Sequence, residues 1–100
     1  MSDVLLTHAA DLTDQLAAAH RELALTLCTE LEHKASVWLS SGVTTASGRE
    51  READYQAHMY TQEVLRLKGE IQALIVELGQ VDRQIAYREF LERRLEREGE

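Results

Sequence analysis

The chain has no proline and no asparagine, only five glycines, and few aromatic side chains. Proline and glycine interrupt helices most strongly, so their scarcity favours long helical segments. The residues that dominate instead are Ala, Leu, Glu, Gln and Arg, which lose little conformational freedom in a helix. With one Trp and one Phe, a conventional globular core would be short of large side chains. The composition therefore predicts an all-α protein that is stabilised by coiled-coil packing and by assembly.

Cysteines and long apolar runs are also scarce. Cys28 is the only cysteine, so it has no partner for an internal disulfide, which is typical of a reducing compartment. No stretch approaches the roughly 20 apolar residues that cross a bilayer, and the first residues lack the basic segment of a signal peptide. We therefore expect a cytoplasmic protein that does not enter a membrane. The formal net charge of −7 argues against a simple electrostatic binder of duplex DNA.

Motifs for catalysis or metal binding are missing as well. A zinc or di-iron site on helices needs a second His or Cys at three- or four-residue spacing, which none of the histidines has: His8, His20, His33 and His58. The sequence contains no glycine-rich phosphate cradle and no nucleophile elbow. We expect Cys28 to be a small, half-buried apolar side chain. The prediction is a protein that is not an enzyme and takes no cofactor or metal.

An apolar stripe predicts a first helix from about residue 3 to residue 40. Its members follow alternating four- and three-residue steps and later three consecutive four-residue steps: Leu5, Ala9, Leu12, Leu16, Ala19, Leu23, Leu27, Leu31, Ala35 and Trp38. The later steps break strict heptad spacing. A turn is expected over residues 41–47, where Gly42 can take the left-handed conformation that ends a helix and Val43 weakens propagation.

A second helix is expected over about residues 48–97. Ser47 to Glu50 has the pattern of a capping box, and Thr44 or Thr45 are the alternative caps. Apolar residues then follow alternating three- and four-residue steps without a miss, which indicates a coiled-coil seam. We assign this seam to an oligomer interface, with the members Tyr60, Val64, Leu67, Ile71, Leu74, Leu78, Val81 and Ile85.

A reversal at Gly42 would make the two helices an antiparallel coiled-coil hairpin and a single domain over residues 1–100. Residue i would then lie opposite roughly residue 88 − i. Residues after about Ala86 would have no partner in their own chain. They carry an apolar partner edge that would contact a second subunit or another protein, formed by Tyr87, Phe90, Leu91 and Leu95. The alternative is a continuous helix pair that dimerises without folding back.

Several basic residues of the second helix lie three or four residues from an acidic one, as in ordinary salt-bridged solvent faces. In the functional alternative, an oligomer gathers basic side chains against single-stranded nucleic acid, and Trp38, Tyr55 or Tyr60 stacks on its bases. The candidate phosphate contacts are Lys34, Lys68, Arg83 and Arg88.

Four segments between about residues 31 and 92 carry a family resemblance: Lys34 to Leu39, Gly42 to Thr45, Arg49 to Ala53, and Ile85 to Phe90. Together they resemble small helical-hairpin proteins of bacteriophages, among them the recombination-mediator (UvsY) family. This resemblance implies a non-catalytic oligomer in the host cytoplasm that binds single-stranded DNA and the recombinase or single-strand-binding protein on it. It also implies that the four candidate phosphate contacts bind the DNA backbone.

We therefore predict a non-enzymatic, homo-oligomeric scaffold, acting as a phage recombination mediator or DNA-replication accessory. The alternative is a protein-only coiled-coil module that acts in phage assembly or inhibits a host protein. The acidic charge favours the protein-only module. The hairpin pattern and the charged restart after the turn favour the mediator.

Overall fold

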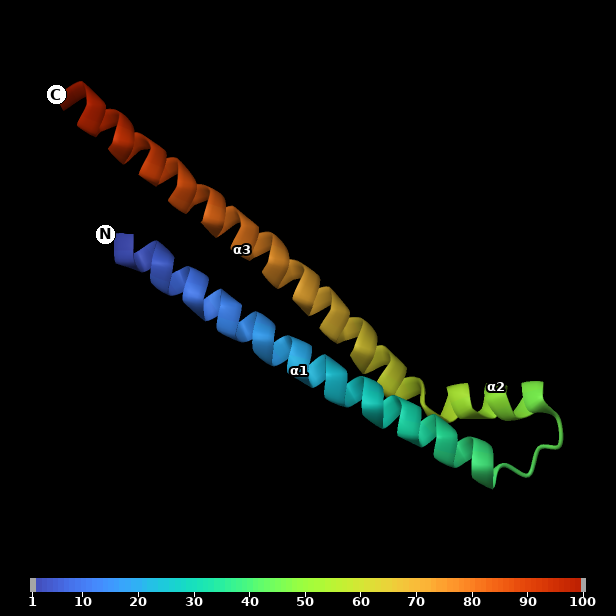
Figure 1. Cartoon of the computed structure of the whole chain (residues 1–100). Coiled ribbons are helices and arrows are strands. Elements are labelled where there is room, and N and C mark those ends of the chain that lie inside the picture. The colour runs from blue at the N-terminus through green and yellow to red at the C-terminus, as the bar shows by residue number, and fades with distance from the viewer. Residues whose placement is uncertain (1, 100) are drawn as a thin grey trace. The chain divides into compact units, whose positions relative to one another are not determined.

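The computed structural model describes residues 2–99, so that Met1 and Glu100 of the predicted domain range 1–100 lie outside the described residues. The described part of the chain forms three helices, α1 (Ser2–Ser40), α2 (Ala46–Gln56) and α3 (His58–Gly99) (Figure 1). No strand occurs between residues 2 and 99. The prediction of an all-α protein is confirmed.

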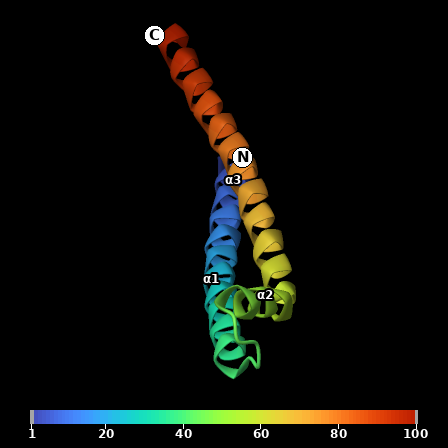
Figure 2. The same ribbon diagram turned by 90° about the vertical axis from the view of Figure 1, so that its right-hand side faces the viewer.

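The chain divides into two compact units, each of which contains parts of α1 and α3. The terminal unit joins Met1–Ala18 to Ile71–Glu100, and the central unit runs from Ala19 to Glu70. Within each unit, α1 and α3 lie side by side and run in opposite directions (Figures 1 and 2). The predicted helical hairpin is therefore confirmed, whereas its assembly into oligomers stays a prediction.

The core of the terminal unit is formed by apolar side chains of α1 and α3. Its buried members are Leu12, Ile71, Leu74 and Val81. They occupy heptad positions of the two helices, because positions three and four residues apart share one helix face. Beyond the start of α1, α3 continues alone to its C-terminal end (Figure 1).

Small side chains dominate the core of the central unit. Ala19, Ala53, Ala57 and Val64 are buried there, and Leu67 is the largest side chain that is completely covered. Alanines allow helix backbones to approach closely, and they leave little space for larger apolar groups. Leu67 is consequently the side chain of the central unit whose shortening would leave the largest fully enclosed space.

The inner face of α1 departs from the predicted apolar stripe after Leu23. Half-buried positions continue in heptad steps as Thr26, Glu30, His33 and Val37. Of the apolar residues expected there, Trp38 is half-buried, whereas Ala35 is exposed. Leu27 and Leu31 are exposed, Leu31 by 70 %. Each four-residue step turns about 40° beyond a full helical turn, so apolar residues at consecutive four-residue steps drift off a face that keeps heptad spacing.

The turn between α1 and α2 differs from the prediction in the residue that caps α2 and in the backbone conformation of Gly42. Thr45 is the N-cap, and its hydroxyl oxygen accepts a hydrogen bond of 3.1 Å from the Gly48 backbone N–H. Thr45 was one of the two alternative caps expected from the sequence. The prediction of a capping box that begins at Ser47 is wrong. No glycine among residues 2–99 has a positive φ, so the left-handed conformation expected for Gly42 is wrong as well.

The expected second helix is divided at Ala57. Ala57 has φ −91° and ψ 5°, a conformation outside the helical range, and its backbone N–H donates to the Ala53 carbonyl oxygen. α2 and the first turns of α3 consequently run in different directions (Figures 1 and 2). Because neither proline nor glycine stands at this point, the sequence pattern gave no sign of the break.

Candidate functional site

The side chains assigned to an oligomer seam are covered by the chain itself. Val64 and Leu67 are buried in the central unit, and Ile71, Leu74 and Val81 are buried in the terminal unit. The other three members are half-buried: Tyr60, Leu78 and Ile85. The heptad pattern was read correctly as a seam, but its partner is α1 of the same chain. The role of this seam in an oligomer stays a prediction.

The predicted partner edge is open to solvent. Its four side chains are between 38 and 67 % exposed: Tyr87, Phe90, Leu91 and Leu95. They belong to the segment of α3 that extends beyond the start of α1 in both views (Figures 1 and 2). With about 100° between successive residues of a helix, these four positions lie on one side of α3. The edge is a continuous apolar face on a helix that no other part of its unit covers.

Three arginines lie next to Phe90 of this edge. Phe90, Arg93, Arg94 and Arg97 line a shallow depression on one face of α3. The carboxylates of the same segment restrain two of these cations weakly, since Arg93 lies 3.7 Å from Glu89 and Arg94 lies 3.4 Å from Glu98. Exposed pairs of this kind contribute little stability, so the arginines can exchange partners.

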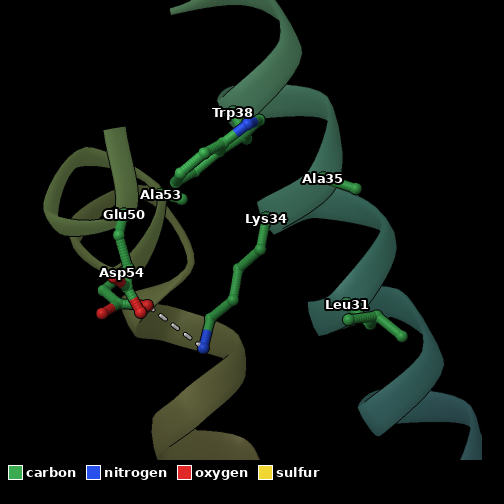
Figure 3. A pocket seen from close by; sticks show the side chains of 7 residues that line it. All are labelled: Leu31, Lys34, Ala35, Trp38, Glu50, Ala53 and Asp54. Atoms are coloured by element: carbon green, nitrogen blue, oxygen red, sulfur yellow. Dashed lines mark ion pairs between the residues drawn. The ribbon is translucent and has the colours of Figure 1, made fainter. Parts of the chain in front are cut away.

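A second surface lies between α1 and α2 in the central unit, and we call it the α1–α2 groove (Figure 3). It has a volume of about 450 Å³, and its lining consists of Leu31, Lys34, Ala35, Trp38, Glu50, Ala53 and Asp54. The Trp38 ring extends from α1 toward Ala53 of α2, and Glu50 and Asp54 lie next to each other (Figure 3). The groove therefore combines an apolar wall with an acidic side.

Lys34 connects the two helices of the groove. Its ammonium lies 3.5 Å from Glu30 on α1 and 3.4 Å from Asp54 on α2. Burial lowers the pKa of Lys34, but the hydrogen bond to Asp54 and the attraction of both carboxylates outweigh this effect, so the pKa lies above its ordinary value of 10.5. Lys34 is thus a charged link between α1 and α2.

The carboxylates of the groove exceed its cations. Lys34 has two acidic partners, whereas Glu50 is exposed and forms no ion pair with any described residue. Glu30, outside the groove lining, has one buried oxygen, Oε2, without a hydrogen-bond partner among the described residues. The groove can accept a further positive charge.

A separate charged cluster lies on the outer side of the central unit. Arg66 contacts Glu63 at 2.5 Å, Glu70 at 3.1 Å and Glu22 at 3.8 Å. The hydrogen bond from Arg66 holds the pKa of Glu63 below its ordinary value of 4.5. Glu22 lies on α1 and Arg66 on α3. Their numbers add up to 88, so their contact agrees with the predicted pairing of residue i with about residue 88 − i. The cluster links α1 to α3.

The candidate phosphate contacts are dispersed over the structure. Lys34 is engaged by two carboxylates, and Lys68 is exposed, both in the central unit. Arg83 donates a hydrogen bond of 3.2 Å to the Gly79 carbonyl oxygen, and Arg88 is half-buried, both in the terminal unit. Each unit thus holds two of the four, and no cluster of them forms within either unit. Their role as DNA contacts stays a prediction.

Within the described part of the chain, the histidines and the cysteine do not gather into a metal-binding group. Among residues 2–99, no three His, Cys, Asp or Glu side chains come together in a way that could hold a metal ion. The His33 ring instead contacts the Tyr60 ring, with centroids 5.3 Å apart. Cys28 is exposed, so the expectation of a half-buried side chain is wrong. It follows Leu27, where the apolar residues have left the inner face of α1.

The α1–α2 groove was not recognised in the sequence. Its signal was present in the four-residue steps that carry Leu27 and Leu31 away from the heptad phase. These steps break strict heptad spacing, and in the structure they place apolar side chains on a second face. The partner wall on α2 had no such signal, because it depends on the break at Ala57.

Comparison with protein-family models, with curated proteins and with solved structures found no match to this chain. The resemblance to recombination mediators therefore rests on the short segments alone. None of the helices described is long and apolar enough to cross a membrane.

Proposed function

We propose that this chain is a non-enzymatic helical interaction module that self-associates through the partner edge on α3. The observation that carries the proposal is the exposure of Tyr87, Phe90, Leu91 and Leu95 on a helix segment that α1 does not cover. A free apolar face of this kind is a disadvantage for an isolated helix, because it remains in contact with water. Association would remove it from water.

The covered seam strengthens this assignment. Since Leu67, Leu74 and the other seam residues are already satisfied by α1, the chain does not need a partner to bury its heptads. The edge is therefore an additional surface, beyond what the hairpin uses for folding. We place the module in the cytoplasm, because its single exposed Cys28 suits a reducing compartment.

Sedimentation velocity of two substituted chains tests the proposal. Phe90→Asp places a charge in the centre of the edge, and we expect it to shift the association toward monomer because a carboxylate resists burial in an apolar contact. Met59→Asp is the matched control, since Met59 is also an exposed apolar residue of α3 but lies outside the edge. Equal association of both variants would contradict the proposal.

Binding of single-stranded DNA is the second candidate function. The observation that favours it is the grouping of Arg93, Arg94 and Arg97 around Phe90. Single-strand binders combine an aromatic stacking surface with cations that follow the backbone, and each stacked base contributes about 1–3 kcal/mol. This reading would retain the mediator role that the family resemblance implies, with a recombinase or single-strand-binding protein as further partner.

Fluorescence anisotropy with a labelled single-stranded oligonucleotide separates the two candidates. Micromolar binding that weakens as salt increases, and that Arg94→Gln with Arg97→Gln removes, would support DNA binding. The absence of binding at low salt would restrict the function to protein association.

A further inference from the structure

The α1–α2 groove and the partner edge have complementary chemistry, although they belong to different units of the chain. The groove offers an indole face at Trp38, an apolar wall at Leu31 and a carboxylate without an ion-pair partner at Glu50. The edge offers a phenyl ring at Phe90 within a group of arginines. Each surface carries the groups that the other lacks.

We propose that the α1–α2 groove of one chain receives the Phe90 and arginine face of a second copy of this chain. In this contact, the Phe90 ring packs against Trp38 and Leu31, and the Arg94 or Arg97 guanidinium pairs with Glu50. This inference rests on the proposed self-association and adds the receiving surface. The contact is heterologous, because two different surfaces meet.

Charge distribution identifies a second copy as the occupant. Arg93, Arg94 and Arg97 are the only three arginines within five consecutive residues, and they line one depression with Phe90, while the carboxylates of this segment alternate with them along the helix. The groove lining carries two carboxylates, Glu50 and Asp54, and one ammonium, Lys34, which is itself paired with Asp54 and with Glu30. Opposite potentials of two surfaces direct encounter and fix the register of a complex.

The residue types at both surfaces are those that dominate protein contacts. Tryptophan and arginine are enriched among the side chains that carry most of the binding energy, and they act best when surrounding contacts exclude water. A guanidinium above an indole face gains a further cation–π attraction. Trp38 is half-buried and therefore already fixed in position by its own helix and by Ala53.

A mixing experiment with the full chain tests this contact. Glu50→Arg disables the groove, and Arg94→Glu with Arg97→Glu disables the edge. By sedimentation velocity, we expect each variant alone to associate about tenfold more weakly than the wild type, because like charges would meet in the contact. A mixture of the two brings opposite charges together in both possible contacts, the unchanged edge with the unchanged groove and the reversed edge with the reversed groove, so association should return to near the wild-type level.

Charge-matched controls separate this effect from a change in net charge. Asp14→Arg matches Glu50→Arg, and Arg21→Glu with Lys68→Glu matches the edge variant, since all three control positions are exposed and lie outside both surfaces. The controls should associate as the wild type does. Circular dichroism verifies that each variant retains its helix content.

Three results would overturn the inference. If Glu50→Arg associates as the wild type while the edge variant does not, the edge binds another surface, and the proposed function remains valid. If both variants lose association and their mixture does not recover it, the two surfaces do not contact one another. If the wild type is a monomer at every concentration, the proposed self-association fails together with the groove contact.

Discussion

The backbone of Gly48 lies very close to two side chains of the preceding turn. A Cβ atom at this position would stand 2.5 Å from Val43 Cγ1 and 2.7 Å from Thr45 Oγ1. The Thr45 hydroxyl cannot move away freely, because it caps α2 by accepting the Gly48 N–H. Gly48 is therefore the glycine that the turn requires for space.

Gly48→Ala should destabilise the fold, and Gly42→Ala should not. The added methyl group at position 48 forces a shift of Val43 or of the N-cap, which costs about 1–3 kcal/mol. Around Gly42 a Cβ would meet no atom within 4 Å, and the φ of this residue is not positive. Gly42→Ala should therefore be neutral or stabilise by about 0.4–1 kcal/mol. Urea unfolding at one protein concentration measures both; equal stability of the two variants would contradict this account.

The hydrogen bond between Arg66 and Glu63 predicts a titration that depends on one partner. Because Arg66 lowers the folded-state pKa of Glu63, the pair stabilises the fold above about pH 4.5, and this contribution disappears as the pH falls through the lowered pKa. Carbon-13 NMR of the Glu63 carboxyl group should give a pKa below 4.5 in the wild type. In Arg66→Gln the pKa should rise toward 4.5, and an identical titration in both chains would refute the interaction.

At the scale of the helix pair, Leu67 is the side chain on which the central unit depends. It is fully buried, whereas Leu65, two residues earlier on the same helix, is exposed. Leu67→Ala should cost about 2–5 kcal/mol, because the neighbouring alanines cannot fill the cavity. Leu65→Ala should change the free energy of unfolding by less than about 0.5 kcal/mol. Thermal and urea unfolding measure the free energy of unfolding of both variants. Similar losses of stability for Leu67→Ala and Leu65→Ala would show that the heptad phase is assigned wrongly.

Much of the helical architecture could be predicted from the sequence, because helix formation follows local composition and apolar spacing. The end of α1 at Ser40 and the phase of the α3 seam agree with the pattern. The break at Ala57 could not be predicted, since no proline or glycine stands there. The N-cap at Thr45 could not be singled out, because Thr44, Thr45 and Ser47 have similar preferences for the N-cap position.

The candidate site was predictable only in the part that lies on a single helix. The apolar positions after Ala86 and their exposure follow from helix periodicity and from the unequal reach of the two helices in the terminal unit. The groove requires α2 to turn toward α1, which no local pattern of the sequence specifies. In the sequence, Glu50 and Asp54 have the pattern of ordinary solvated charges. In the structure, they line the same groove as Trp38.

At the scale of the whole molecule, the partner edge should be dispensable for folding and necessary for association. Replacing Tyr87, Phe90, Leu91 and Leu95 together by alanine preserves helix propensity and removes the apolar side chains. We expect unchanged helix content by circular dichroism and the loss of self-association in sedimentation velocity. A fourfold alanine variant at exposed apolar positions outside the edge, such as Leu25, Met59 and Leu65 with Val4, is the control. Association that survives in the edge variant would remove the role assigned to the edge.

The most direct test of self-association is the mass of the unmodified chain as a function of concentration. Sedimentation equilibrium from about 1 to about 100 μM covers the affinities expected for a weak or moderate protein contact. The account predicts an average mass that rises above the 11.4 kDa of one chain as the concentration increases. A mass that stays at 11.4 kDa over the whole range would contradict it, since the partner edge would then remain exposed in the isolated molecule.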